Sequence, residues 1–263
     1  MFSVVIPVYN HDKYLDEALV SVLSDNLVSE VLIADDGSRD RSAQIIELAA
    51  KRFPGKVRNL TQKPAVNVGA HAMLNRLTNA VRNDWVAVLN SDDKFVPGRF
   101  SVIRNLSKMF QFDFCFGNLA IIDGDSTTIG RKRAFLDPQY PFPPFTGEPV
   151  ADKRLLLMMF SQNYIATTSN MLFKKSLWEQ VGGFRDYRYA HDWDFAIRCM
   201  MQGKVRYIAE YLTYYRVHGS NTISESRTLQ DIEIRKIFKV LEDDLSIDSV
   251  DSADRFLRSN QYL

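Results

Sequence analysis

The stretch that decides the fold is Trp85–Phe100, WVAVLNSDDKFVPGRF, in which an apolar run stops abruptly at a polar cluster. The run Val86–Leu89 has four apolar residues bounded by turn-forming ones, a pattern typical of a buried central strand. The segment Asn90–Asp93 then follows at the strand's carboxyl end. In an open α/β sheet, ligands bind outside the carboxyl ends of the strands, so we expect these carboxylates to face a ligand.

Asp92 and Asp93 are neighbouring like charges that repel each other. A hard cation such as Mg²⁺ or Mn²⁺ prefers oxygen ligands, would relieve this repulsion and could bridge to a diphosphate. The alternative is that the two acids only cap a helix that begins near Pro97. The pair alone leaves both interpretations open.

Composition sets broad limits. With 263 residues, of which 46% are hydrophobic, the chain can form one large α/β domain or a core with an appendage. Its 33 basic and 32 acidic residues give a net charge of +1, which predicts no nucleic-acid partner.

Location is predicted from the cysteines and the apolar runs. Cys115 and Cys199 lie in apolar surroundings without metal-ligand spacing, which suits a reducing cytoplasm. There is no basic leader and no run near the roughly 18 apolar residues of a membrane span. We therefore expect a cytoplasmic protein, at most peripheral at the membrane, whose oligomeric state the sequence does not indicate.

The first hundred residues alternate between strand-like and helix-like patterns. Short apolar runs occur at Ser3–Val8, Glu30–Ala34, Val57–Thr61 and Trp85–Leu89, and helix-period segments separate them. This alternation predicts a mainly parallel sheet with helices on both faces and right-handed crossovers.

The pattern loosens after residue 100, which predicts a mixed sheet. We expect a helix from Phe100, a strand at Asp113–Asn118, and a hairpin turn in which Asp123-Gly124 supplies the positive φ angles. Further expected elements are strands at Thr168–Phe173, Val205–Ala209 and Leu212–Val217, and helices at Leu155–Phe160 and Ala190–Gln202. The proline-rich segment Asp137–Val150 is predicted to be a surface loop, either an acceptor-facing lid or a simple connector.

The last forty residues are polar, yet they contain an amphipathic pattern that predicts a helix docked on the domain, formed by Leu229, Ile232, Ile237, Val240 and Leu241. We therefore divide the chain into one α/β domain, 1–222, with a nucleotide-binding half (1–100) and an acceptor-binding half (101–222), and a helical extension, 223–263.

Seven motifs occur together in a characteristic order. They are IPVYN in the first strand, ADDGSRD, NVG at Asn67–Gly69, SDD with Pro97 and Arg99 after it, GGF at Gly182–Phe184, HDWD, and YYRVHGSNT. In combination they resemble the family 2 inverting glycosyltransferases of the GT-A fold over roughly residues 1–222. The resemblance implies transfer of a sugar from a nucleotide-diphosphate donor to a glycan or lipid-linked acceptor, with Mn²⁺ or Mg²⁺ as cofactor.

The resemblance also implies roles on the nucleotide side. Asp35 and Asp36 would contact uracil and ribose, and Asn67 belongs to the same nucleotide-binding set. Pro7, Val8 and Tyr9 would line the base pocket, although Tyr9 is as readily explained as a core residue.

For the metal, the resemblance assigns Asp93 as a ligand and Asp92 to ribose or metal. The family's Asp-x-Asp begins with Asn90 here, so the cluster has one charge fewer. His218 matches a position near the diphosphate and is a candidate third ligand, with a structural histidine as the alternative. Arg216 would reach the phosphates or form a strand-end salt bridge.

The catalytic base matches Asp192, preceded by His191 where similar sequences have glutamate. Asp194 is expected to pair with Arg198 at i+4. The arginine that family members place after the Asn-x-Gly motif is absent here, because Met73-Leu74-Asn75 fills that position.

Two competing functions remain. A sugar nucleotidylyltransferase or a dinucleotide oxidoreductase would need a glycine-rich loop after the first strand, where this chain has Pro-Val-Tyr-Asn. A protein that binds sugar nucleotides or glycans without turnover is supported only by the changes at Asn90 and His191. Retention of Asp92, Asp93 and Asp192 favours the enzyme.

Overall fold

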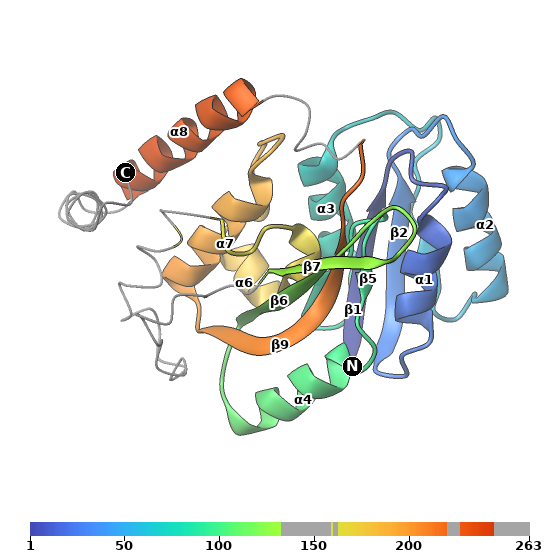
Figure 1. Cartoon of the computed structure of the whole chain (residues 1–263), viewed down its shortest axis with the longest axis horizontal. Coiled ribbons are helices and arrows are strands. Elements are labelled where there is room, and N and C mark those ends of the chain that lie inside the picture. Colours follow the sequence, from blue (N-terminus) through green and yellow to red (C-terminus); the bar gives the residue numbers. More distant parts are fainter. Residues whose placement is uncertain (133–158, 160–162, 220–226, 245–263) are drawn as a thin grey trace.

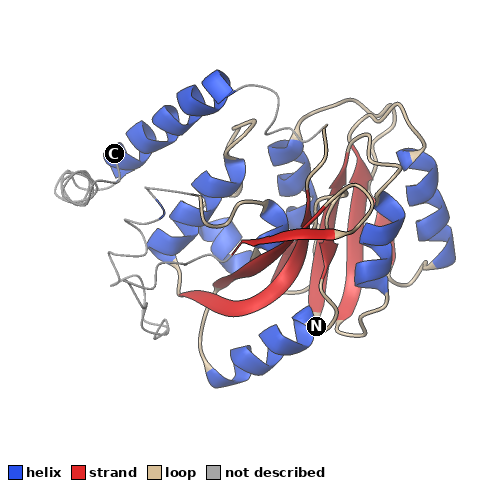
Figure 2. Cartoon of the chain, in the orientation of Figure 1, coloured by secondary structure: helices blue, strands red, loops and turns tan. Residues whose placement is uncertain are grey.

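The computed structural model describes residues 1–132, 159, 163–219 and 227–244. In these residues the chain forms one nine-stranded mixed sheet with helices packed on both faces (Figures 1 and 2). The α/β class and the GT-A-like arrangement predicted from the sequence are confirmed. Strands from before and after residue 100 belong to the same sheet. The predicted division into two functional halves at that residue stays a prediction.

The first four strands form a parallel block. The order is β3 (Val57–Asn59), β2 (Val28–Asp35), β1 (Phe2–Val8) and β4 (Trp85–Val88), with every neighbouring pair parallel. Val8 is paired with Asp35 in the β1–β2 register. The carboxyl ends of these strands therefore lie at one edge of the sheet, as expected from the alternating pattern.

The remaining strands make the sheet mixed. β8 (Leu172–Lys174) lies antiparallel between β4 and β6 (Phe114–Ile122), and β9 (Val205–Arg216) runs parallel to β6. The short β5 (Lys94–Phe95) pairs with β9, and β7 (Thr128–Lys132) forms a hairpin with β6. The acidic loop between β4 and β5 is thus fixed at both ends by different parts of the sheet.

Two apolar clusters hold the helices to the sheet. On one face α1 (Leu15–Leu23), α2 (Ser42–Arg52) and α4 (Arg99–Met109) cover a cluster that includes Leu15, Ile46 and Phe100. On the other, α3 (Ala70–Asn79), α6 (Lys175–Gln180) and α7 (His191–Gln202) bury Leu74, Leu177 and Phe195. The helical periods of these six helices therefore marked most of the core-facing residues, although Leu48 of α2 is exposed.

Three local expectations need correction. Thr168–Asn170 is a 3₁₀ turn and not the start of a strand, because its side chains bond to the acidic loop. The two strands predicted in the segment 205–217 are one continuous β9. In the β6–β7 hairpin the positive φ lies at Ser126 and not at Gly124. The segments 137–150 and 155–158, and residue 160, lie outside the described residues.

The C-terminal helix α8 (Arg227–Asp244) exists, and of the residues predicted to dock it Ile237 is confirmed, whereas three others are exposed. Ile237 is fully buried, with Ile234 and Phe238 packed beside it, whereas Leu229, Ile232 and Val240 are exposed. The spacing 234, 237, 238 is itself helical, so the sequence supported two possible faces. None of the helices in the described part of the chain has the length and apolar character that crossing a membrane requires.

Candidate active site

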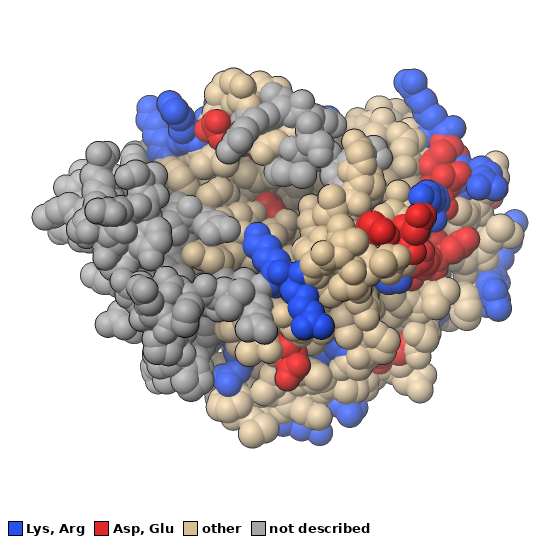
Figure 3. Space-filling model, in the orientation of Figure 1, with Lys and Arg blue, Asp and Glu red and all other residues tan. Residues whose placement is uncertain are grey.

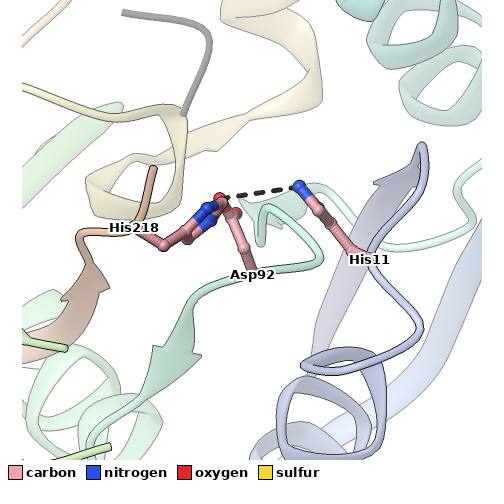
Figure 4. A group of neighbouring side chains, drawn as sticks. All are labelled: His11, Asp92 and His218. Carbon is pink, nitrogen blue, oxygen red and sulfur yellow. Dashed lines mark hydrogen bonds and ion pairs between the residues drawn. The ribbon is translucent and has the colours of Figure 1, made fainter. Parts of the chain in front are cut away.

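A group of three potential metal ligands lies at the carboxyl end of β4. Nε2 of His218 is 3.1 Å from Oδ2 of Asp92, and Nε2 of His11 is 3.9 Å from the same oxygen. The two imidazoles approach the carboxylate from opposite sides (Figure 4). The ligand atoms all lie within 4.8 Å of one another, so small side-chain shifts would bring them onto one ion.

Protonation in this group favours metal binding. Burial lowers the pKa of His11, which keeps its imidazole neutral, the form that ligates metals. Burial acts to raise the pKa of Asp92, but the hydrogen bond with His218 opposes it, and the net effect of its surroundings is to lower that pKa. Ser91 Oγ lies 2.7 Å from Nδ1 of His11 and orients the ring, as outer-shell partners commonly do for ligating histidines.

Asp93 has a different environment from Asp92. Its Oδ2 accepts hydrogen bonds from Ser169 Oγ (2.6 Å) and Thr167 Oγ1 (3.2 Å), and its Oδ1 accepts one from the Arg216 amide (2.8 Å). Burial and the neighbouring charge of Asp92 raise the pKa of Asp93 to about 8. The Asp93 carboxylate therefore ties the loop to the 3₁₀ turn and β9, and it is not a member of the three-residue group.

Asn90, which replaces the first acid of the family motif, bonds to the same turn. Its Nδ2 donates to Thr167 Oγ1 (3.0 Å), and its Oδ1 accepts from Thr168 Oγ1 (2.7 Å). An amide can donate and accept at once, whereas a carboxylate can only accept. The asparagine thus suits a structural position between two threonine hydroxyls.

Arg216 is fully buried and bonded to protein groups. Its guanidinium donates to the Asp92 carbonyl (2.7 Å) and the Asp123 carbonyl (3.0 Å), and it contacts Glu17 at 3.3 Å. It also lies over the ring of Tyr14. These contacts match the strand-end alternative raised by the sequence, and contact with phosphate stays a prediction.

The two aspartates predicted to bind the nucleotide, Asp35 and Asp36, have different hydrogen-bond partners. Asp36 accepts hydrogen bonds from the amides of Val68 (2.7 Å) and Gly69 (3.0 Å), so it fixes the loop that leads into α3. Asp35 accepts one from the Ser38 amide, but its buried Oδ1 has no hydrogen-bond partner among the described residues. A buried carboxylate oxygen needs a donor, so Asp35 Oδ1 is the free acceptor at this edge.

The remaining nucleotide-side residues surround Asp35. Tyr9 is 45% exposed at the end of β1, while Val8 is buried and Pro7 partly buried. Asn67 is exposed on a loop that passes close to Gly37, where φ is +82° and an added Cβ would lie 3.1 Å from the Asn67 amide. Tyr9 and Asn67 are therefore accessible to a ligand, and Val8 serves the core.

Asp192 begins the first turn of α7. Its Oδ1 accepts a hydrogen bond from the Trp193 amide (2.7 Å) and its Oδ2 one from Asn163 Nδ2 (3.2 Å). The carboxylate is 7% exposed. At the beginning of a helix this carboxylate lies near the positive end of the helix dipole. Nδ1 of His191 is buried without a partner among the described residues.

Tyr215 links the base candidate to the acidic loop. Burial, together with the charges of Asp93, Asp92 and Asp192, raises the pKa of Tyr215. Its hydroxyl is therefore within electrostatic range of all three carboxylates. Burial also lowers the pKa of Lys132, against the opposing charge of Asp192.

Sequence reasoning missed His11, Lys132, Tyr215 and the turn Thr167–Ser169 as parts of this site. His11 could have been found, because it follows the first strand and so lies at the sheet edge that holds Asp92. Lys132 lies on β7 and the turn precedes β8, and the pairing of these two strands has no local signal in the sequence.

The face in Figure 3 shows Lys and Arg side chains scattered among other residues, without one continuous basic patch. It agrees with the small net charge of +1. This face therefore gives no support for nucleic-acid binding.

Comparison with known proteins gives consistent matches. The family model described as glycosyl transferase family 2 matches residues 3–182. An uncharacterized glycosyltransferase of Nostoc sp. is 28% identical over 228 residues, covering 83% of this chain and 65% of that protein. The chondroitin synthase of Escherichia coli is 27% identical, covering 94% of this chain but 33% of the synthase. The chain thus spans less than two thirds of the length of these relatives.

Solved structures show the same fold at low identity. TarS of S. aureus, in complex with UDP-GlcNAc, has a TM-score of 0.66 and 16% identity, over 86% of this chain and 61% of that chain. A mannosyltransferase from Pyrobaculum calidifontis, in complex with GDP-Man and Mn²⁺, has a TM-score of 0.60 over 91% of this chain and 63% of that chain. With the GT-A architecture and the family match over most of the sequence, the chain belongs to glycosyl transferase family 2.

Proposed function

We propose that this protein is a metal-dependent inverting glycosyltransferase that moves a hexosyl group from a nucleotide-diphosphate sugar to an acceptor hydroxyl. The observation on which the proposal rests is the His11–Asp92–His218 group at the same sheet edge as the unpartnered Asp35 oxygen. A cation site beside a nucleotide-side acceptor suits a ligand with a base, a ribose and a diphosphate.

The side chains present fit a divalent cation. Asp92, His218 and His11 offer one carboxylate oxygen and two imidazole nitrogens. Bound there, Mn²⁺ or Mg²⁺ would neutralise the charge of the leaving diphosphate. Imidazole suits transition metals better than Mg²⁺, so this donor set favours Mn²⁺.

Residues of the protein itself would bind the nucleotide and accept the proton of the acceptor hydroxyl. Asp35 Oδ1 would accept a hydrogen bond from the base or ribose, and Tyr9 would pack against the base. The Asp192 carboxylate would take the proton of the attacking acceptor hydroxyl as a general base. In a single displacement the hydroxyl attacks opposite the leaving diphosphate, so the anomeric configuration inverts.

The donor we favour is UDP-linked. The relative TarS was solved with UDP-GlcNAc and the mannosyltransferase with GDP-Man, so the fold accepts different bases. The acceptor we propose is a hydroxyl of a glycan or lipid-linked sugar in surface polysaccharide assembly. The reaction would take place in the cytoplasm, with the protein at most peripheral at the membrane.

A panel of sugar nucleotides tests the proposal directly. Release of the free nucleoside diphosphate from at least one UDP-sugar, dependent on Mn²⁺ or Mg²⁺, is the expected result. The product should have the anomeric configuration opposite to that of the donor.

Two outcomes would redirect the assignment. Tight UDP-sugar binding without turnover for any acceptor tried would support a binding protein. Equal binding of UDP in Mn²⁺ and in a chelator, measured by calorimetry, would remove the metal from the proposal.

A further inference from the structure

The segment that precedes α7 is held by a carboxylate from the C-terminal helix. Glu233 Oε1 accepts a hydrogen bond from the Arg188 amide (2.6 Å). Glu233 Oε2 accepts two more, from the amides of Tyr189 (2.6 Å) and Ala190 (2.9 Å). Three consecutive backbone donors directed at one carboxylate form an anion-binding nest, and α8 supplies the anion from within the chain.

Apolar contacts hold the same two helices together. Ile237 is fully buried in the core cluster, and the ring of Phe238 meets Trp193 edge to face with centroids 5.5 Å apart. Glu233 and Ile237 are four residues apart and therefore project from the same side of α8. Figure 1 shows α8 on the same side of the molecule as α7. α8 thus contacts the beginning of α7 through one polar group, the Glu233 carboxylate, and one apolar group, the Phe238 ring.

The residues that α8 contacts lie on both sides of the base candidate, Asp192. Ala190, whose amide bonds to Glu233, is two residues before Asp192, and Trp193, which meets Phe238, is the residue after it. The Trp193 amide also donates to Asp192 Oδ1 (2.7 Å). Any movement of this segment would therefore displace the Asp192 carboxylate.

We propose that Glu233 is a positioning residue that fixes Arg188–Ala190 and thereby sets the place of the Asp192 carboxylate. The inference rests on the proposed role of Asp192 as the base. Glu233 lies beyond the residues 3–182 that the family model matches. Asp192 and α7 also lie beyond that range, so the proposed contact joins two parts of the chain that the family model does not cover.

The physical reason is positional tolerance. General base catalysis needs the carboxylate within hydrogen-bond reach of the acceptor hydroxyl, and a misplacement of about 1 Å can cost up to about 10²-fold in rate. Donor binding is assigned to Asp92, His11, His218 and Asp35, which contact one another, Ser91 and Ser38, whereas Glu233 bonds to the amides of Arg188–Ala190. Loss of the Glu233 contact should therefore lower kcat and leave the donor KM unchanged.

The test uses the full chain with Glu233→Gln, which keeps the size of the side chain but loses its charge. Asp231→Asn is the matched control, because Asp231 is an exposed acid on the same helix. Hydrogen exchange is measured for the amides of residues 188–193, together with binding of UDP in Mn²⁺ and steady-state UDP release from a turned-over UDP-sugar. In Glu233→Gln, exchange of the 188–190 and Trp193 amides should rise at least about tenfold, and kcat should fall about tenfold or more.

UDP binding and the donor KM should not change, and Asp231→Asn should match the wild type in every measurement. Unchanged exchange at 188–193 in Glu233→Gln would overturn the inference, and so would faster exchange with an unchanged kcat. If Glu233→Gln does not fold, Glu233→Asp, which keeps the charge but shortens the reach, is measured in the same way.

Failure of the proposed function gives a different pattern. The wild type would then show no UDP release, while the exchange comparison would still decide whether Glu233 holds the segment and the Trp193–Asp192 contact.

Discussion

Two adjacent aspartates have opposite chemical surroundings in this protein. Asp92 faces two imidazoles, whereas three protein donors occupy the oxygens of Asp93. The resemblance to the family had assigned the metal first to Asp93. The structure therefore allows the two assignments to be separated by single substitutions.

We expect Asp92→Asn to weaken UDP binding in Mn²⁺ at least about tenfold, because an amide is a far poorer metal ligand than a carboxylate. Its free energy of unfolding should change little. Asp93→Asn, the matched variant, should instead lose about 1–3 kcal/mol of stability, since it replaces one of the two oxygens that accept from Ser169, Thr167 and Arg216. Calorimetry with and without a chelator, and urea unfolding, provide both values. The reverse pattern would restore Asp93 as the ligand.

Asp192→Asn tests the base. Transfer should slow by about 10²- to 10⁴-fold, the usual contribution of general base catalysis, with UDP and Mn²⁺ binding unchanged. Asparagine serves the beginning of a helix about as well as aspartate, so the melting temperature should stay close to that of the wild type. A variant with near-normal transfer, or a product that retains the donor's configuration, would exclude the mechanism.

Among single residues, the sequence indicated those that lie at strand ends and missed those that arrive by tertiary pairing. Asp35 and Asp92 lie at the carboxyl ends of predicted strands, so a rule about sheet edges was enough to place them, whereas the role proposed for Asp192 came from the resemblance. His218 was named from the resemblance. Ser169 lies in a stretch that reads as an ordinary strand, because its hydroxyl contact with Asp93 depends on a chain segment 76 residues away.

At the level of elements, the loop that leads to α7 depends on a close approach between α3 and the Gly182–Gly183 turn. Asn75 Oδ1 accepts the Phe184 amide (2.7 Å), and Asn75 Nδ2 donates to the Phe184 carbonyl (2.7 Å). A Cβ on Gly183 would lie 2.6 Å from that Oδ1, whereas a Cβ on Gly182 would meet nothing within 4 Å. The position after the Asn-x-Gly motif thus fixes the segment that leads to α7.

The two glycines form a matched experiment. Both have positive φ, +77° and +71°, so alanine at either should cost about 1–2 kcal/mol of backbone strain. Gly183→Ala should cost at least about 1 kcal/mol more, because its Cβ overlaps Asn75. Chemical unfolding of both variants measures the difference. Equal losses of stability in the two variants would show that Asn75 moves away from the added Cβ without an energetic cost.

Glu30 forms hydrogen bonds to three different segments of the chain. We expect its contribution to the stability of the fold to decrease at acid pH. It is 5% exposed, and it accepts hydrogen bonds from Ser3 Oγ on β1, the Arg82 amide and Arg58 on β3. Burial acts to raise the pKa of Glu30, but these bonds and the Arg58 charge outweigh it and lower that pKa below its usual 4.5. Its stabilisation is therefore fully present above the unfolded-state pKa and is lost as the pH falls through the lower folded-state value.

We expect Glu30→Gln to cost about 3 kcal/mol at pH 7, and the gap to the wild type to narrow below about pH 4. Urea unfolding between pH 3 and 7 measures this. Glu47→Gln is the control, because Glu47 only meets Lys63 at 3.8 Å on the surface and should change stability by less than about 1 kcal/mol at any pH. A gap for Glu30→Gln that is constant with pH would contradict the assignment.

For the whole molecule, the predictable part of the fold was the part built from local repeats. The parallel block β3-β2-β1-β4 follows from alternating patterns along the first hundred residues. The order β8-β6-β9-β5 could not be predicted from the sequence. β5 is only two residues long, and no periodic pattern indicates that it pairs with Thr213 and Tyr214. The docking face of α8 was ambiguous, because Ile237 fits the predicted set and also fits the set with Ile234 and Phe238 that packs on the core.

The pairing of β5 with β9 has a consequence for how the chain is made. The central strand β4 and the loop after it leave the ribosome long before Ser169 and Arg216, whose hydroxyl and amide hold Asp93. Until then β4 has β1 on one side and an open edge on the other, since its second neighbour is β8. Such long-range pairing is slow to form and leaves apolar strands exposed to other chains in the meantime. The proposed sugar-nucleotide site is therefore expected to be among the last regions to fold after translation. A nascent chain that stalls before β9 would be a substrate for chaperones and proteases rather than a partly active protein.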